Sequence, residues 1–193
     1  MTVNELVTIL KKNPVIPCTN KLEDYENHDF ASSKVVLLYD FSIFDLKNFK
    51  TAVRQFNKFT IFSLETMSGI ANDDEGVKFL RDTLGIEAVE SSSPRALSSA
   101  KKMGMITVQT IFTFDSKSII KATKLMQEIK PDFIDIRPGI SLLKIKGIMN
   151  SIEKYKIICS GMISTQKEIE LLIKNGATAV TTSKKELWGL YYQ

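Results

Sequence analysis

Short apolar segments alternate along the chain with amphipathic segments of helical period. The apolar segments lack a clear polar face, which is typical of strands buried on both sides in a parallel sheet. We predict eight such strands, at residues 15–19, 34–40, 59–65, 86–91, 105–112, 133–138, 156–161 and 177–183. The strand and helix unit recurs about every 24 residues, one eighth of the 193-residue chain.

The segments between these strands have the apolar spacing and the end signals of helices. Residues 45–57 carry Leu46, Phe49, Val53 and Phe56 on one face, and residues 165–175 carry Ile169, Leu172 and Ile173. Glycine stands at the predicted helix ends, at Gly85, Gly104 and Gly176. Pro131 is predicted to end the helix that precedes the sixth strand.

Serine and threonine mark the predicted helix starts. Ser116 and Ser164 are predicted N-caps. Thr2 and Glu5 have the spacing of a capping box, and Leu6 and Leu10 continue one face of the segment. We therefore predict an extra helix at the N-terminus, which covers the bottom of the sheet structure.

Strict alternation of strands and helices predicts a parallel sheet. Eight units without an evident edge strand favour closure into a compact TIM-like (β/α)8 barrel, with residues 1–193 as a single domain. An open, doubly wound sheet is the alternative.

Composition narrows the class of protein. Hydrophobic residues make up 44% of the chain and charged residues 25%, which excludes a disordered or fibrous protein. No apolar run approaches the roughly 20 residues that span a bilayer. Two cysteines, Cys18 and Cys159, form no disulfide framework, so a cytoplasmic location is expected. The net charge of +4 is compatible with a nucleic-acid partner without requiring one.

Barrels of this kind place their sites at the carboxyl ends of the strands. The last two strands end in Ser160 and Gly161 and in Thr181, Thr182 and Ser183, and a helix is predicted from about Lys184. Free backbone N–H groups at a helix start attract an anion, and a glycine allows its close approach. These five residues are predicted to bind phosphate, and an ordinary turn with capping hydroxyls is the alternative.

Further polar residues are predicted at the same ends of the strands: Asp40, Glu65, Glu90, Gln109, Asp135, Arg137 and Ser160. Glu65, Gln109, Asp135 and Arg137 are candidates for the ligand pocket. Side chains two apart in a strand share a face, which pairs Glu65 with Ser63 and Asp135 with Arg137.

Signals for catalysis are weak. The single histidine, His28, is expected on a helix surface, and Cys159 lies inside a strand. A general base would have to be Glu65 or Asp135. The carboxylates at the strand ends are compatible with Mg²⁺ and equally with helix capping. We predict no catalytic residue, no metal site and no cofactor.

Three motifs carry a resemblance to a known family: PDFIDIRPGI (131–140), ICSGMIST (158–165) and NGATAVTTSKKELW (175–188). They resemble the glycerol-3-phosphate-responsive antiterminators, which regulate glycerol uptake operons. Weaker similarity begins at VIPCTN (15–20) and extends to residue 188. The matching positions are Glu65, Gly69, Gln109, Asp115, Asp135, Pro138, Gly139, Gly161, Thr165, Gly176, Ala177, Val180, Thr182, Ser183 and Trp188.

The resemblance implies a TIM-like fold and a role without enzymatic activity. It implies that glycerol 3-phosphate, or a related small phosphate, is the effector and that leader mRNA of glycerol-metabolism genes is the partner. In the family pattern, cations usually stand at the positions where this chain has Asn20, Ser93, Thr110 and Leu143. A histidine usually stands at the position of Ser63, and a leucine at the position of Arg137. Arg137 therefore has two open roles, as the ligand's cation or as a plug paired with Asp135, Glu65 or both.

Two other functions stay open. One is a phosphate-substrate enzyme on the same barrel, of the isomerase, aldolase or prenyl-glycerol-phosphate synthase type, and the other is a scaffold whose site has decayed. No RNA-binding motif is present, only basic residues, namely Lys101, Lys102, Lys117, Lys121, Lys124, Lys144 and Lys146. A homodimer is compatible with a regulator, but nothing in the sequence specifies one.

Overall fold

The computed structural model describes residues 1–26, 30, 32–45, 58–145, 147–149 and 152–191. Eight parallel strands form a closed barrel in sequential order, and β8 pairs with β1. Their bounds are β1 (Val15–Thr19), β2 (Val35–Leu38), β3 (Phe59–Ser63), β4 (Ala88–Ser91), β5 (Ile106–Phe112), β6 (Phe133–Arg137), β7 (Lys156–Ser160) and β8 (Ala179–Thr182). The predicted barrel is confirmed, and the open sheet is excluded.

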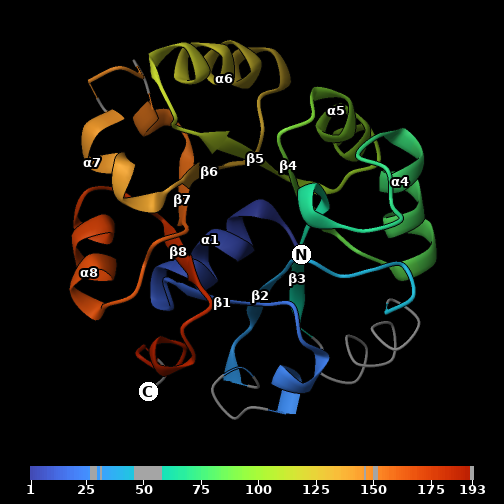
Figure 1. The fold of residues 1–193 in the computed structure, drawn as a ribbon, viewed down its shortest axis with the longest axis horizontal. Helices are drawn as coiled ribbons and strands as arrows, with labels where there is room; N and C mark the ends of the chain where they lie inside the picture. The colour runs from blue at the N-terminus through green and yellow to red at the C-terminus, as the bar shows by residue number, and fades with distance from the viewer. Residues whose placement is uncertain (27–29, 31, 46–57, 146, 150–151, 192–193) are drawn as a thin grey trace.

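The described helices surround the barrel, except for α1, which lies across one of its ends (Figure 1). They are α1 (Val3–Lys12), α4 (Asp74–Lys78), α5 (Pro94–Lys102), α6 (Ser116–Ile129), α7 (Leu142–Ile145) and α8 (Gln166–Lys174). A π-helical segment, Phe79–Leu84, continues α4, and short 3-10 turns lie at Leu22–Glu26, Leu64–Thr66, Gly139–Ser141, Ile152–Lys154 and Lys185–Leu187. The helix predicted over 45–57 falls on residues 46–57, outside the described residues, as does His28. None of the described helices is long and apolar enough to cross a membrane.

Helix ends follow the predicted chemistry with two corrections. Thr2 and Glu5 form the predicted capping box, with the Thr2 N–H donating to Glu5 Oε2 at 2.7 Å. The N-cap of α6 is Asp115, not Ser116, because its carboxylate accepts from the Ser118 N–H at 2.7 Å. The N-cap of α8 is Thr165, not Ser164.

The three glycines predicted at helix ends all have positive φ. The angles are +73° at Gly85, +70° at Gly104 and +94° at Gly176. Each lies in the left-handed region, which a residue without a Cβ occupies at little cost. These turns reverse the chain from a helix into the next strand, as predicted.

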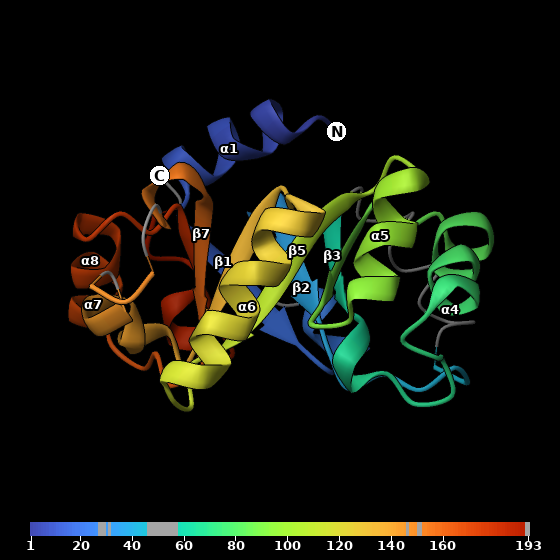
Figure 2. The same cartoon turned by 90° about the horizontal axis from the view of Figure 1, so that it is seen from above.

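The barrel interior is filled from the bottom upward by apolar side chains. Leu6 and Leu10 of α1 are buried against the first inward residues of the strands, including Ile16 and Phe133. Figure 2 shows α1 lying across this end of the barrel, apart from the ring of other helices. α1 therefore covers the amino-terminal ends of the strands, as predicted, and leaves the carboxyl ends for a site.

Trp188 fixes the chain after the last strand. Its side chain is only 1% exposed and packs on Phe30 with ring centroids 5.2 Å apart. Its indole N–H donates to the Thr182 carbonyl at 2.8 Å. Trp188 thus holds the end of β8 in place beside the barrel mouth.

Candidate ligand site at the barrel mouth

A cavity of about 210 Å³ opens at the carboxyl ends of the strands. All five residues predicted to bind phosphate line it, together with Arg137. The described residues that line it are Cys18, Leu37, Tyr39, Thr66, Arg137, Ser160, Gly161, Met162, Ile163, Thr181, Thr182 and Ser183. The structure therefore gathers the ends of β7 and β8 and the Arg137 side chain of β6 around one space.

Two glycines shape the loop that borders this cavity. Gly161 has φ +78°, and a Cβ built on it would meet nothing within 4 Å. The Gly139 N–H donates to the Gly161 carbonyl at 3.2 Å, and a Cβ on Gly139 would lie 3.1 Å from Cys159 Cβ. The loop after β6 therefore packs tightly on the end of β7, while the Gly161 backbone faces open space.

Two of the hydroxyl groups that line the cavity donate hydrogen bonds to other groups of the protein. Thr181 Oγ1 donates to Ser160 Oγ at 2.7 Å. Thr182 Oγ1 donates to the Ile163 carbonyl at 3.0 Å and accepts from the Lys184 N–H at 3.2 Å. These threonines therefore shape the cavity wall, and the remaining donors for an anion include the backbone, Ser160, Ser183, Tyr39 and Arg137.

The helix predicted from Lys184 is only the 3-10 turn Lys185–Leu187, with Lys184 at its N-cap. A turn of this length adds few aligned peptide dipoles, so it contributes less positive potential than a full helix. The short turn brings Trp188 back to the Thr182 carbonyl.

Arg137 forms the side of the cavity that faces the barrel interior. Its Nε donates to Asp135 Oδ2 at 2.5 Å, and its Nη2 donates to Glu90 Oε2. Both carboxyl groups are 0% exposed, whereas the arginine side chain keeps 22% of its surface exposed. No hydrogen-bond partner of Nη1 occurs in the part of the chain that the structure describes. Arg137 thus anchors on buried carboxyls and still reaches the cavity.

The carboxyl groups of Asp135 and Glu90 share one cation, so the barrel interior holds more carboxyl groups than cations at this point. Burial raises the pKa of Asp135 well above its usual value, and the Glu90 carboxylate beside it raises that pKa further. Arg137 lowers the pKa only in part. The surroundings of Asp135 therefore favour its neutral form more than water does.

Four buried polar atoms in this inner layer have no hydrogen-bond partner among the described residues. They are Ser63 Oγ, Glu90 Oε1, Thr110 Oγ1 and Asp135 Oδ1. Each residue follows an inward-facing apolar residue two positions earlier in its strand, so all four point into the barrel. Ser63 and Thr110, two of the positions that the sequence resemblance singled out, therefore lie in the barrel interior.

Glu65 and Gln109, both predicted for the pocket, do not line the cavity. β3 ends at Ser63, so Glu65 sits in the following 3-10 turn and no longer shares a face with Ser63. There it accepts from the Ser92 N–H and, at 3.0 Å, from Ser91 Oγ. Burial acts to raise the pKa of Glu65, but hydrogen bonds led by that of the Ser92 N–H hold it below its usual value.

Asp135 and Gln109 miss the cavity for different reasons. Asp135 lies deeper in the barrel, behind Arg137. Gln109 points outward from β5, where its Nε2 donates to the Ala122 carbonyl of α6 at 3.2 Å. Of the two partners predicted for Arg137, Asp135 is confirmed, whereas Glu90 takes the place predicted for Glu65.

The lining also contains residues that sequence reasoning missed, namely Cys18, Leu37, Tyr39 and Thr66. Strand alternation was the available signal for two of them, since Cys18 follows Ile16, and Leu37 follows Val35, on the inward face. Burial, followed by the nearby Glu90 charge, raises the pKa of Cys18 to about 12. Its thiol therefore stays protonated and is a poor nucleophile at neutral pH.

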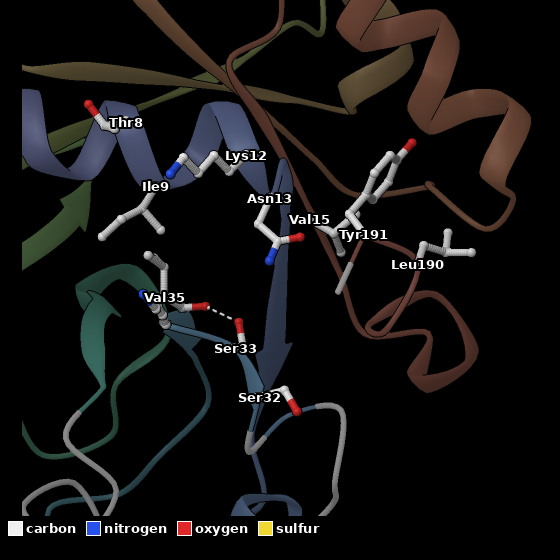
Figure 3. Close-up of a pocket in the computed structure, with 11 residues that line it drawn as sticks. Thr8, Ile9, Lys12, Asn13, Val15, Ser32, Ser33, Val35, Leu190 and Tyr191 are labelled. Carbon is white, nitrogen blue, oxygen red and sulfur yellow. Dashed lines mark hydrogen bonds between the residues drawn. The ribbon is translucent and has the colours of Figure 1, made fainter. Parts of the chain in front are cut away.

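A second cavity, of about 620 Å³, lies at the opposite end of the barrel (Figure 3). Thr8 and Lys12 of α1 border it, and Ser33 Oγ donates there to the Val35 carbonyl at 2.8 Å. Binding and catalytic sites of such barrels lie at the other end, and this end serves stability. Within the described ranges, no three His, Cys, Asp or Glu side chains gather as a metal site.

Comparison with known proteins shows the family of this chain. A family model described as glycerol-3-phosphate responsive antiterminator matches residues 15–188. The protein YgcP of Escherichia coli strain K12 is 20% identical over 185 residues, which cover 96% of each chain.

Solved structures give the same result. A glycerol uptake operon antiterminator regulatory protein from Listeria monocytogenes matches with a TM-score of 0.84 and 26% identity, over 91% of this chain and 95% of that one. A glycerol uptake operon antiterminator-related protein from Thermotoga maritima matches with a TM-score of 0.76 and 21% identity, over 90% and 96%. Enzymes, among them decarboxylases and aldolases, share the fold at lower identity.

Proposed function

The chain belongs to the glycerol-3-phosphate-responsive antiterminator family, a family of transcription regulators, and from this premise we propose how it senses its effector. Glycerol 3-phosphate, or a closely related small phosphate, binds in the cavity at the barrel mouth. The protein in that state contacts the leader mRNA of glycerol-metabolism genes and prevents termination. The effector is a ligand, and no cofactor takes part.

One observation carries the proposal: Ser160, Gly161, Thr181, Thr182 and Ser183 line a single cavity with the Arg137 guanidinium. The Gly161 backbone faces open space, so a phosphate oxygen can approach it closely. The guanidinium offers a planar set of donors that suits a phosphate, and its Nη1 has no partner among described side chains.

Arg137 has both of the roles that its sequence position left open. The buried Glu90 and Asp135 fix the guanidinium, so that it is already oriented toward the cavity before a ligand arrives. A cation held in place loses less conformational freedom on binding than a free side chain. Glu90 offsets the positive charge of the Arg137 guanidinium, so we propose that the site binds phosphate with modest affinity.

The geometry favours a regulator over a phosphate-substrate enzyme. Glu65 and Asp135, the two candidate general bases, do not line the cavity, and Asp135 lies behind Arg137. Cys18 does line the cavity, but its raised pKa keeps the thiol protonated. We therefore propose ligand binding without turnover.

Thermal unfolding with increasing glycerol 3-phosphate tests the effector site. Binding should raise Tm, with about 2.7 kcal/mol of stabilisation at one hundred times Kd. Glycerol without phosphate should give no shift. Gly161→Glu should abolish the shift, because it places a negative charge where the phosphate would sit.

The matched control is Gly85→Glu. Gly85 also has positive φ (+73°) and open space around a built Cβ, but it lies at the other end of the barrel. Both substitutions should lower Tm through similar backbone strain, and only Gly161→Glu should remove the ligand shift. A wild-type protein that is folded and shows no shift at tens of millimolar phosphate ester contradicts the effector site. Turnover of triose or glycerol phosphates would contradict the regulator.

A further inference from the structure

A groove of about 430 Å³ lies outside the barrel, between the start of α5 and α6. Its walls include Pro94 of α5, Phe112 and Phe114 at the end of β5, and Lys121 and Lys124 of α6. We call it the α6 groove. We propose that the α6 groove binds single-stranded RNA, with a base stacked on Phe114 and phosphates held by the lysines of α6. The proposal rests on the proposed function, which supplies RNA as the partner.

The aromatic pair is the first observation. Phe112 and Phe114 are stacked, with centroids 5.5 Å apart and planes 5° from parallel. Phe114 is nevertheless 81% exposed, so one face of its ring packs on Phe112 and the other face is open. An open ring face supported from behind is a platform for a nucleobase, because every base has a flat π surface.

The lysine stripe is the second observation. Lys117, Lys121 and Lys124 are spaced by four and three residues, so they follow one face of α6. All three are at least partly exposed, and none has an ion-pair partner in the described ranges. Among the described residues that line the groove, Glu128 is the only acidic one, whereas Lys121 and Lys124 are both cations. Such a row next to an aromatic platform matches a phosphate backbone with its bases.

The groove floor carries a further unsatisfied group. Gln109 is 0% exposed, and its Nε2 donates to the Ala122 carbonyl. Its Oε1 has no hydrogen-bond partner among the residues that the structure describes. Gln109 also lines the groove, but its Oε1 is buried from solvent, so the proposal rests on the aromatic pair and the lysines.

Backbone contacts link the groove to Arg137, which lines the effector cavity. Phe112 pairs with Arg137 across the β5 and β6 ladder. Thr113, between the two phenylalanines, donates through its N–H and its Oγ1 to the Arg137 carbonyl, both at 3.0 Å. The residue that borders the effector cavity therefore holds the backbone of the aromatic platform in place.

Other occupants fit less well. A second copy of this chain would bring like-charged lysines together around the same helix. An acidic peptide would satisfy the lysines but would leave the open face of Phe114 without a matching group. Single-stranded RNA satisfies both features.

Fluorescence anisotropy tests this inference on the full chain, at low salt with glycerol 3-phosphate present. The probe is a labelled mixed-sequence RNA of about 15 nucleotides, within the usual range of single-strand sites. Phe114→Ala should weaken binding about tenfold, as expected for loss of one stacked base. Phe44→Ala is the matched control, since Phe44 is 86% exposed in another loop after a strand, and it should leave affinity unchanged.

Salt dependence tests the lysines separately. The double variant Lys121→Ala/Lys124→Ala should reduce the slope of log Kobs against log salt by about 1.4, or about 0.7 for each RNA phosphate that a lysine no longer neutralises. The matched control, Lys167→Ala/Lys174→Ala, removes two exposed lysines from α8 and should leave the slope unchanged.

The outcomes separate this inference from the proposed function. If wild type binds RNA and the groove variants behave like their controls, the groove is not the RNA site, and the proposed function stands. If polyglutamate displaces the RNA and Phe114→Ala has no effect, the groove is a general anion surface and the inference is overturned. If RNA binding depends on Phe114 but glycerol 3-phosphate causes no thermal shift, the inference holds and the effector site is wrong.

Discussion

Arg137 lies between a cavity open to solvent and two carboxyl groups that are fully buried. Removing a charge from water is costly, and only close partners of opposite charge compensate for it. The carboxyls of Asp135 and Glu90 provide this compensation for the arginine, and the arginine provides it for them. The side chain is therefore a structural element and a wall of the candidate site at once.

This pairing predicts a large loss of stability in Arg137→Leu. The leucine would leave two buried carboxyls without a cation, which should lower the free energy of unfolding by about 3–5 kcal/mol. Urea unfolding measures the change. Arg95→Leu is the control, because Arg95 and Asp74 form an exposed pair at 3.1 Å, whose loss should cost no more than about 1 kcal/mol. A neutral or stabilising Arg137→Leu would show that Arg137 does not plug the barrel.

Asp135 predicts a pH dependence whose sign follows from its raised pKa. The folded protein holds this proton more tightly than the unfolded chain, where the pKa is about 3.9. The resulting stabilisation is complete below about pH 3.9 and is lost as pH rises through the raised pKa. Asp135→Asn keeps the shape and the neutral state, so it should remove this loss.

The measurement is urea unfolding of wild type and Asp135→Asn across a range of pH. The stability of the variant relative to wild type should increase with pH, because only wild type has a carboxyl to ionise there. A difference between the two curves that stays constant with pH would mean that Asp135 titrates as it does in the unfolded chain.

Strands and helix ends differ in how well the sequence specifies them. Each predicted strand is present, because an apolar segment such as residues 34–40 can be buried on both sides only within the sheet. Two predicted N-caps lie one residue away from the observed ones. In both cases two neighbouring residues have similar capping strength: Asp115 and Ser116 for α6, and Ser164 and Thr165 for α8. Backbone geometry, rather than residue type, decides between such neighbours.

The cap of α6 gives a direct test at this scale. Asp115→Ala removes the acceptor of the Ser118 N–H and should lower the free energy of unfolding by about 1 kcal/mol. Ser116→Ala changes the adjacent residue, which lies inside the helix, and should alter stability by no more than about 0.5 kcal/mol. Chemical denaturation of both variants checks the pair. Equal losses, or a larger loss for Ser116→Ala, would place the cap at Ser116 instead.

At the scale of the whole molecule, the sequence predicted the site residues that adjacent strands bring together. It missed the residues that meet only because the barrel is closed. Ser160 and Thr181 meet because β7 and β8 are adjacent, which the order of units already implies. Glu90 of β4 reaches Arg137 of β6 past the intervening β5, because the curvature of the closed sheet turns their inward side chains toward each other. The short turn after β8 was missed because its sequence has no Gly or Pro before Gly189 to end a helix.

Closure also separates the end that stabilises the barrel from the end that carries the site. Leu6 of α1 is 0% exposed in the apolar cluster at the amino-terminal ends of the strands. Leu6→Ala should lower the free energy of unfolding by about 2–5 kcal/mol, through lost burial and the cavity left behind. Leu171→Ala, at a side chain that is 41% exposed on α8, should change stability far less.

Calorimetric titration with glycerol 3-phosphate, at a temperature where both variants are folded, should give the wild-type Kd for each. A folded Leu6→Ala protein with a weakened Kd would show that α1 and the barrel mouth are coupled through the interior.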